Sequence, residues 1–191
     1  MKKSIVILAS GGGSLAQAIM DAVNDGELDI QILEVISDKP GANVLERAEE
    51  SGIKTFVHPM LPNRAQWDSE LMRHIESLNP DLVVSVGFMR ILSPEFVTTF
   101  KVINTHPALL PKFPGAHPVR DALAAGVAVT GATVHWVDSG VDSGKVIAQT
   151  EVDVLPEDSE STLHERIKIV EQGLIVETLK NLLPTLESDH V

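Results

Sequence analysis

Short apolar runs rich in β-branched residues alternate with helix-like segments over the first 105 residues, and this alternation restricts the fold more than any other feature. Between the runs, apolar side chains recur at helical spacing, and Ser14 is in place to cap the first such helix. Strands that alternate with helices predict a parallel sheet with helices on both faces. The apolar runs are residues 5–9, 30–36, 55–57, 82–86 and 102–105.

The pattern changes after residue 105. Four prolines between residues 107 and 118 exclude a regular strand there. Residues 129–137 and 145–154 are β-rich and joined by a Gly-containing segment, so they predict an antiparallel strand pair. Thr162-x-x-Glu165 is predicted to cap a last helix. We therefore expect a single-domain, Rossmann-like α/β fold, whose mixed sheet is mostly parallel with an antiparallel pair near the C-terminal end.

Charge and composition limit the classes of partner. The 191 residues include 15 Lys and Arg against 27 Asp and Glu, a net charge of -12, which argues against nucleic acid and anionic membranes as partners. There is no cysteine, so no disulfide framework is available. The N-terminal apolar run is too short for the core of a signal peptide, and none approaches the ~18 residues of a membrane span. We expect a cytoplasmic protein that binds small molecules.

A glycine-rich turn follows the first apolar run. Residues 11–16 satisfy G-x-G-x-x-A and place free backbone N–H groups at a helix N-terminus, which favours a phosphate. The same turn also suits a tight strand-to-helix connection that binds nothing. Ligand sites of parallel sheets lie at the carboxyl ends of the strands. We therefore expect residues 10–14, 87–92 and 104–115, which follow three of the strands, to converge.

Asn104 and His106 form the sharpest local feature. They project to the same side of an extended segment, and Pro107 restricts the backbone of His106. An amide and an imidazole aimed together can stabilise an oxygen that becomes negative. Asp142 would favour the charged imidazole, because an opposite charge raises the pKa of a histidine. A structural histidine and a turn aspartate that bonds its own backbone remain the alternatives. The histidines show no metal-ligand spacing, so we expect no metal.

Four stretches together resemble the folate-dependent formyltransferases. They are residues 6–14, 87–94, 104–111 and 134–144, in the order and spacing of that family and over nearly the whole chain. The His-Pro-x-Leu-Leu-Pro element at 106–111, with its upstream Asn and downstream Asp, is the specific part. The resemblance implies transfer of a formyl group from 10-formyltetrahydrofolate to the amine of glycinamide ribonucleotide in de novo purine (IMP) biosynthesis, without a covalent enzyme intermediate.

The resemblance also implies roles for individual residues. Asn104, His106 and Asp142 would form the catalytic set. The ribonucleotide would contact Gly12, Gly13, Ser14, Leu15, Pro107, Lys168 and Glu171. The folate would contact Arg64, Phe88, Met89, Arg90, Ile91, Leu92, Asn104, Asp138, Ser139, Gly140, Val141 and Asp142, with the two arginines near its carboxylate tail. One formyltransferase domain, residues 1–191, would bind phosphate in its N-terminal half (about 1–100) and hold the folate and catalytic groups in about 101–191.

Two positions depart from the family pattern, and several alternatives stay open. Leu15 stands where the family commonly has Asn, and Ala108 where it commonly has Ser. Formyltransferases for methionyl-tRNA or a nucleotide sugar would share the core within a longer chain, and a formyltetrahydrofolate hydrolase would carry a further N-terminal domain. A dinucleotide oxidoreductase would use residues 11–16 and Asp38, and a non-catalytic binding module is the last alternative. We expect a monomer or a homodimer.

Overall fold

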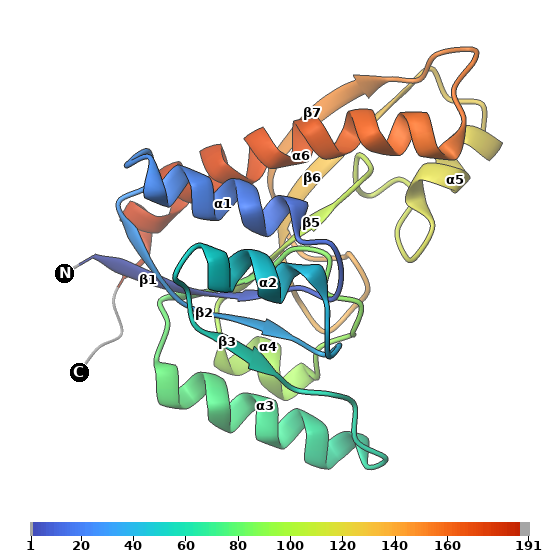
Figure 1. The fold of residues 1–191 in the computed structure, drawn as a ribbon. Helices are drawn as coiled ribbons and strands as arrows, with labels where there is room; N and C mark the ends of the chain where they lie inside the picture. Colours follow the sequence, from blue (N-terminus) through green and yellow to red (C-terminus); the bar gives the residue numbers. More distant parts are fainter. Residues whose placement is uncertain (1, 188–191) are drawn as a thin grey trace.

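A seven-stranded mixed sheet runs through the protein, whose computed structural model describes residues 2–187 (Figure 1). Its order is β3-β2-β1-β4-β5-β6-β7. Neighbouring strands are parallel from β3 to β5, whereas β5-β6 and β6-β7 are antiparallel pairs. The predicted mixed sheet is thus confirmed. The strands are β1 (Lys3–Leu8), β2 (Ile30–Ser37), β3 (Thr55–Val57), β4 (Leu82–Ser85), β5 (Val102–His106), β6 (Val129–Trp136) and β7 (Val146–Asp153).

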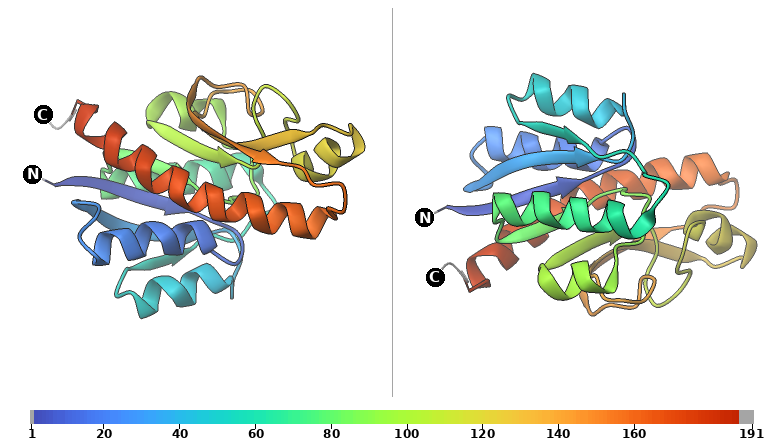
Figure 2. Two further views of the ribbon diagram at one scale, coloured as in Figure 1. Left: turned by 90° about the horizontal axis from the view of Figure 1, so that it is seen from above. Right: turned by 90° about the horizontal axis from the view of Figure 1, so that it is seen from below.

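Helices cover both faces of this sheet (Figure 2). The first face carries α1 (Ser14–Asn24), α2 (Asn43–Glu50) and α6 (Glu160–Leu182), and the second carries α3 (Arg64–Leu78) and α4 (Pro94–Thr99). The short helix α5 (Pro118–Ala124) lies near the start of α6, and a 3-10 turn, Leu183–Thr185, directly follows α6. None of the helices within residues 2–187 combines the length and the apolar composition that crossing a membrane requires.

Strand β1 contributes side chains to two hydrophobic cores, one on each face of the sheet. Ile5 and Ile7 face the core under α1, α2 and α6, and Val6 and Leu8 face the core under α3 and α4. All four are fully buried, because successive side chains of a strand point to opposite faces. Each contributes about 1.5–3 kcal/mol by leaving water. The continuous apolar run therefore fixes the end of β1, and the glycine-rich turn after it, beside the end of the central strand β4.

The first helix does not begin as predicted. Gly13, not Ser14, is the N-cap of α1, and no side chain caps this end. Gly13 has φ 74°, and a Cβ built on it would lie 2.6 Å from the Cβ of Val44 in α2. The position therefore needs glycine both for its backbone conformation and for the close approach of α2. The prediction that Ser14 caps this helix was wrong because the deciding contact comes from another helix.

The last helix also begins elsewhere. Ser159 is its N-cap, and its hydroxyl accepts the backbone N–H of Thr162, whose own hydroxyl accepts the backbone N–H of Ser159. Thr162 is thus the inner member of the capping box, and the predicted pairing with Glu165 was wrong. Helix α5 was not predicted, because the surrounding prolines indicated irregular chain. Pro118 instead stands in its first turn, where a missing N–H costs nothing.

Candidate active site

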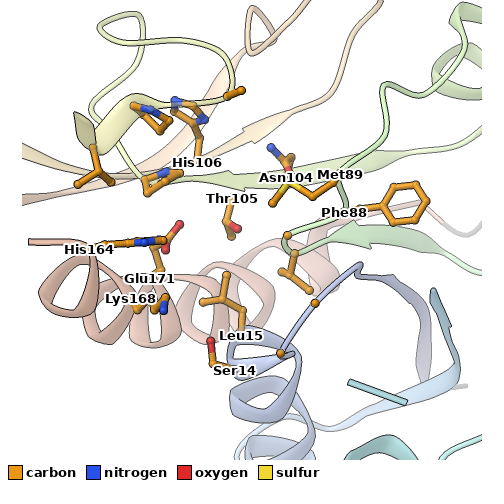
Figure 3. Close-up of a pocket in the computed structure, with 18 of the residues that line it drawn as sticks. Ser14, Leu15, Phe88, Met89, Asn104, Thr105, His106, His164, Lys168 and Glu171 are labelled. Atoms are coloured by element: carbon orange, nitrogen blue, oxygen red, sulfur yellow. The ribbon is translucent and has the colours of Figure 1, made fainter. Parts of the chain in front are cut away.

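A pocket of about 420 Å³ opens at the carboxyl ends of β1, β4 and β5 (Figure 3). The three segments expected to converge all contribute to it, which confirms that prediction. Helix α6 closes the opposite side with side chains that the pattern of strands did not indicate. The lining consists of residues 11–15, 86–89, 104–107 and 115–119, together with Asp142, Glu160, His164, Lys168 and Glu171.

The glycine-rich turn presents the N-terminus of α1 to this pocket. The first helical hydrogen bond runs from the N–H of Gln17 to the carbonyl of Gly13, so the preceding N–H groups have no partner within the helix. Ser14 and Leu15, which carry two of these groups, line the pocket. The helix dipole adds a partial positive charge at the same place. This end of the pocket is therefore suited to a phosphate.

A buried polar cluster joins this turn to the loop after β4. The hydroxyl of Ser10 donates to Asp38 and accepts the backbone N–H of Met89 at 2.8 Å. The Nε of Arg90 donates to the second carboxylate oxygen of Asp38 at 2.6 Å. Asp38 is only 3% exposed, and each of its carboxylate oxygens accepts a hydrogen bond from one of these two partners. The cluster fixes the loop against the turn, and it leaves Asp38 badly placed for the ribose contact of a dinucleotide enzyme.

Asn104, His106 and Asp142 come together beside the pocket. The first two lie two residues apart on β5, and Asp142 comes from the loop between β6 and β7. The Nδ1 of His106 lies 3.5 Å from Asp142 Oδ2, which also accepts the N–H of Gly115 at 2.8 Å. Asp142 therefore bonds a distant loop and not its own turn. Its φ of 52° is a strained value that these contacts hold in place.

Both ring nitrogens of His106 face acceptor oxygens. Its Nε2 lies 2.8 Å from the carbonyl oxygen of Phe113, and a carbonyl only accepts, so Nε2 carries a hydrogen. Its Nδ1 faces the carboxylate of Asp142, which also accepts. The 3.5 Å between Nδ1 and Asp142 Oδ2 exceeds a normal hydrogen bond, so a small movement would be needed to form one.

One face of α6 supplies the other ionisable groups of the pocket, as Figure 3 shows for His164, Lys168 and Glu171. The Nζ of Lys168 pairs with Glu165 at 2.8 Å on the helix surface. Burial raises the pKa of Glu171 to about 7, although Lys168 opposes the shift. Burial, and then the charge of Lys168, lowers the pKa of His164. A cationic side chain and a carboxyl group that ionises near neutral pH thus face the N-terminus of α1.

The residues implied for folate binding divide into two sets. Phe88 and Met89 line the pocket, as do Asn104 and Asp142. Ile91 is 65% exposed beyond the pocket lining, and Leu92 packs into the core under α3 and α4, so only its backbone is free to contact a ligand.

Three charged members of that folate set, Arg64, Arg90 and Asp138, lie outside the lining. Arg64 pairs with Asp68 at 2.9 Å and donates to the carbonyl of Ile91, while Arg90 is held by Asp38. Hydrogen bonds from Ser143 and the Gly140 N–H lower the pKa of Asp138, which therefore stabilises its own turn. Ser139, Gly140 and the half-exposed Val141 belong to that turn.

Several residues in or beside the pocket were not identified as site residues from the sequence. His117, His164 and Glu160 line the pocket, and His135 lies beside Asn104 on the neighbouring strand. The period of four between Glu160, His164 and Lys168 was the only available signal, since it places them on one helix face. Among residues 2–187 there is no group of three or more His, Asp or Glu side chains arranged to hold a metal ion.

Comparison with known proteins agrees with this geometry. The profile of the family described as Formyl transferase matches residues 3–179. Phosphoribosylglycinamide formyltransferase of Mycobacterium tuberculosis is 48% identical over 176 residues, which cover 90% of this chain and 81% of that protein. The Escherichia coli protein of the same name is 41% identical over 175 residues, covering 90% and 82%.

Solved structures show the same likeness. Glycinamide ribonucleotide transformylase 1 from Symbiobacterium toebii superposes with a TM-score of 0.93 at 36% identity, covering 96% of this chain and 88% of that one. Phosphoribosylglycinamide formyltransferase from Bacillus halodurans gives 0.91 at 37% identity, with 97% of both chains covered. The family indicated by the sequence motifs is therefore confirmed, and this chain belongs to the formyl transferase family.

Proposed function

We propose that this chain transfers the formyl group of 10-formyltetrahydrofolate to the amine of glycinamide ribonucleotide, in de novo purine biosynthesis. The observation that carries the proposal is one pocket that holds Asn104, His106 and Asp142 opposite a helix N-terminus suited to phosphate. The family membership and the names of its similar relatives support the same reaction. The products are formylglycinamide ribonucleotide and tetrahydrofolate.

The two substrates would enter the pocket from different sides. The phosphate would bind the first N–H groups of α1, with the Nζ of Lys168 opposite, and Glu171 would contact the glycinamide part. The apolar side chain at position 15 contributes packing only, so the backbone carries this contact. The pteridine would pack along Phe88 and Met89, and its tail would extend over the exposed surface toward Arg64 and Arg90.

The chemistry requires one bond to form and one to break. The amine attacks the formyl carbon, and the carbonyl oxygen becomes an oxyanion that an Asn104 N–H and the His106 imidazolium stabilise. The carbon–N10 bond then breaks, and the proton lost by the amine passes to N10, with Asp142 helping to move it through water. Each preorganised donor contributes about 3 kcal/mol to the transition state.

We further propose one domain that works in the cytoplasm as a monomer or homodimer and binds no nucleic acid. The net charge of -12 supports the last point, because a polyanion would be repelled. Within residues 2–187, the single sheet supports one domain, because its strand β1 packs into both hydrophobic cores. Its N-terminal half would then hold the phosphate, and its C-terminal half most of the catalytic groups.

Formyl transfer measured with both substrates tests the proposal directly. Wild-type protein should produce tetrahydrofolate only when glycinamide ribonucleotide is present, which also distinguishes transfer from hydrolysis. Asn104→Ala should reduce kcat by about 10²–10³-fold, since it removes one oxyanion donor. Asn181→Ala, which changes an exposed asparagine outside the pocket, is the matched control. Folded wild-type protein that releases no tetrahydrofolate under these conditions would overturn the proposal.

A further inference from the structure

Three polar side chains lie in register across three strands at the catalytic asparagine. Ser85 on β4 pairs with Asn104 on β5, and Asn104 pairs with His135 on β6. The hydroxyl of Ser85 donates to Asn104 Oδ1 at 2.9 Å, and Asn104 Nδ2 lies 3.4 Å from His135 Nε2. Ser85 and His135 are both buried, the latter only 2% exposed. The mechanism described above uses neither of them.

The backbone decides which nitrogen of His135 carries the hydrogen. Its Nδ1 lies 2.8 Å from the carbonyl oxygen of Trp136, which only accepts, so Nδ1 is the donor. In the neutral ring Nε2 is then an acceptor, and it requires a donor from Asn104. The amide must therefore turn its NH2 group toward His135 and its oxygen toward Ser85. The reversed amide would place an oxygen against the lone pair of Nε2.

The neutral state of His135 follows from its surroundings. Burial lowers the pKa of its ring, and the nearby charge of His106 acts in the same direction. The hydrogen bond to Trp136 and the carboxylates of Asp142 and Asp138 oppose this shift without reversing it. The closer carboxylate oxygen, Asp142 Oδ1, lies 3.6 Å from Nε2. Protonated His135 would donate toward Asp142 and would no longer accept from the amide.

We propose that Ser85 and His135 are positioning residues that fix the orientation of the Asn104 amide, so that its second N–H serves the reacting oxygen. Asn104 lines the pocket, and one of its two N–H bonds is committed to His135. Reversal of the amide would present a carbonyl oxygen to the developing oxyanion. The inference rests on the proposed function, because it assigns that N–H a role in formyl transfer.

The two partners differ in importance. A hydroxyl donates or accepts, so Ser85 accommodates either orientation of the amide, whereas His135 accepts only one. Ser85→Ala should therefore reduce kcat less than tenfold. His135→Phe should reduce it about 10²-fold with little change in either KM, as expected for a group that acts only in the transition state. His135→Gln, which keeps an acceptor near the position of Nε2, should restore most of the loss.

Two measurements test the inference. Long-range ¹H–¹⁵N correlation spectra of wild-type protein near neutral pH should show His135 as the neutral Nδ1–H tautomer. The Nε2–H tautomer or an imidazolium would overturn the inference whether or not formyl transfer is observed. In the second measurement, His135→Phe is introduced into Asn104→Ala protein and should reduce kcat less than about threefold, because the amide it positions is absent.

A loss of about 10²-fold in both backgrounds would show that His135 acts independently of Asn104 and would also overturn the inference. Thermal unfolding of each variant separates these effects from misfolding, and the spectrum of the unaltered protein decides the matter if His135→Phe does not fold. Wild-type protein that fails to transfer formyl groups overturns the proposed function instead, while the tautomer still reports on the geometry.

Discussion

Replacement of Gly13 by alanine tests how the phosphate end of the pocket is built. The backbone there has φ 74°, which costs an L-residue roughly 1–2 kcal/mol. The new Cβ would lie 2.6 Å from the Cβ and 2.8 Å from the Cα of Val44, so backbone must move, at about 1–3 kcal/mol for overpacking. Alanine also has less conformational entropy than glycine in the unfolded chain, which stabilises the variant by about 0.4–1 kcal/mol.

The free energy of unfolding should therefore fall by about 2–4 kcal/mol. For a chain of this length the melting temperature should drop by roughly 4–16 °C, since each kcal/mol corresponds to about 2–4 °C. Scanning calorimetry measures both quantities. The matched control is Gly11→Ala in the same turn, because a Cβ there meets nothing within 4 Å and the backbone does not have positive φ.

Displacement of the first turn of α1 should also raise the KM for the phosphate-bearing substrate more than the KM for the folate. The reasoning is refuted if the Gly13 and Gly11 variants melt within about 1 °C of each other. It is likewise refuted if the Gly13 variant is destabilised but both KM values change equally, because the turn would then have no particular relation to the phosphate.

Three further predictions concern charges and caps. Asp38→Asn keeps an acceptor for Ser10 but removes the charge that holds Arg90, so steady-state kinetics should show a several-fold higher KM for the folate and an unchanged KM for the ribonucleotide; the opposite pattern would contradict this assignment. Because burial raises the pKa of Glu171 from 4.5 to about 7, its contribution to stability is complete below pH 4.5 and is lost as the pH rises through 7. Between pH 4 and 8, denaturant unfolding should therefore show the free energy of unfolding of the wild type falling by up to about 3 kcal/mol relative to that of Glu171→Gln. Parallel pH curves for the two proteins would show that the pKa of Glu171 does not change on folding. Ser159→Ala removes one half of the capping box of α6 and should lower stability by about 1 kcal/mol in the same assay, whereas an unchanged midpoint would mean that the cap contributes nothing.

The strands were predictable because their physical signal is local. A strand buried on both faces must be apolar, and β1 satisfies this condition from Ile5 to Leu8 and β4 from Leu82 to Val84. The order of strands with intervening helices then placed Gly13, Asn104 and Phe88 at one edge of the sheet. This is why the convergence of three distant segments followed from the sequence without any knowledge of side-chain contacts.

Helix boundaries and partners across the sheet were not predictable in the same way. The N-cap of α1 depends on how closely Val44 of α2 approaches the chain, and no local pattern contains that distance. The position of His135 depends on the register between β5 and β6, since a shift of one residue would turn its side chain to the other face. The partner of Arg90 was missed for a similar reason, because Asp38 follows a different strand.

The cluster formed by Ser10, Asp38 and Arg90 has a consequence for how the two substrates affect one another. Ser10 belongs to the turn that would bind phosphate, and it also holds the N–H of Met89 in the loop that would pack on the pteridine. Both subsites therefore share a single support. If the first ligand spends binding free energy on ordering that support, the second ligand binds more tightly because the support is already ordered. By thermodynamic reciprocity, each ligand then raises the affinity for the other by the same factor, whichever binds first.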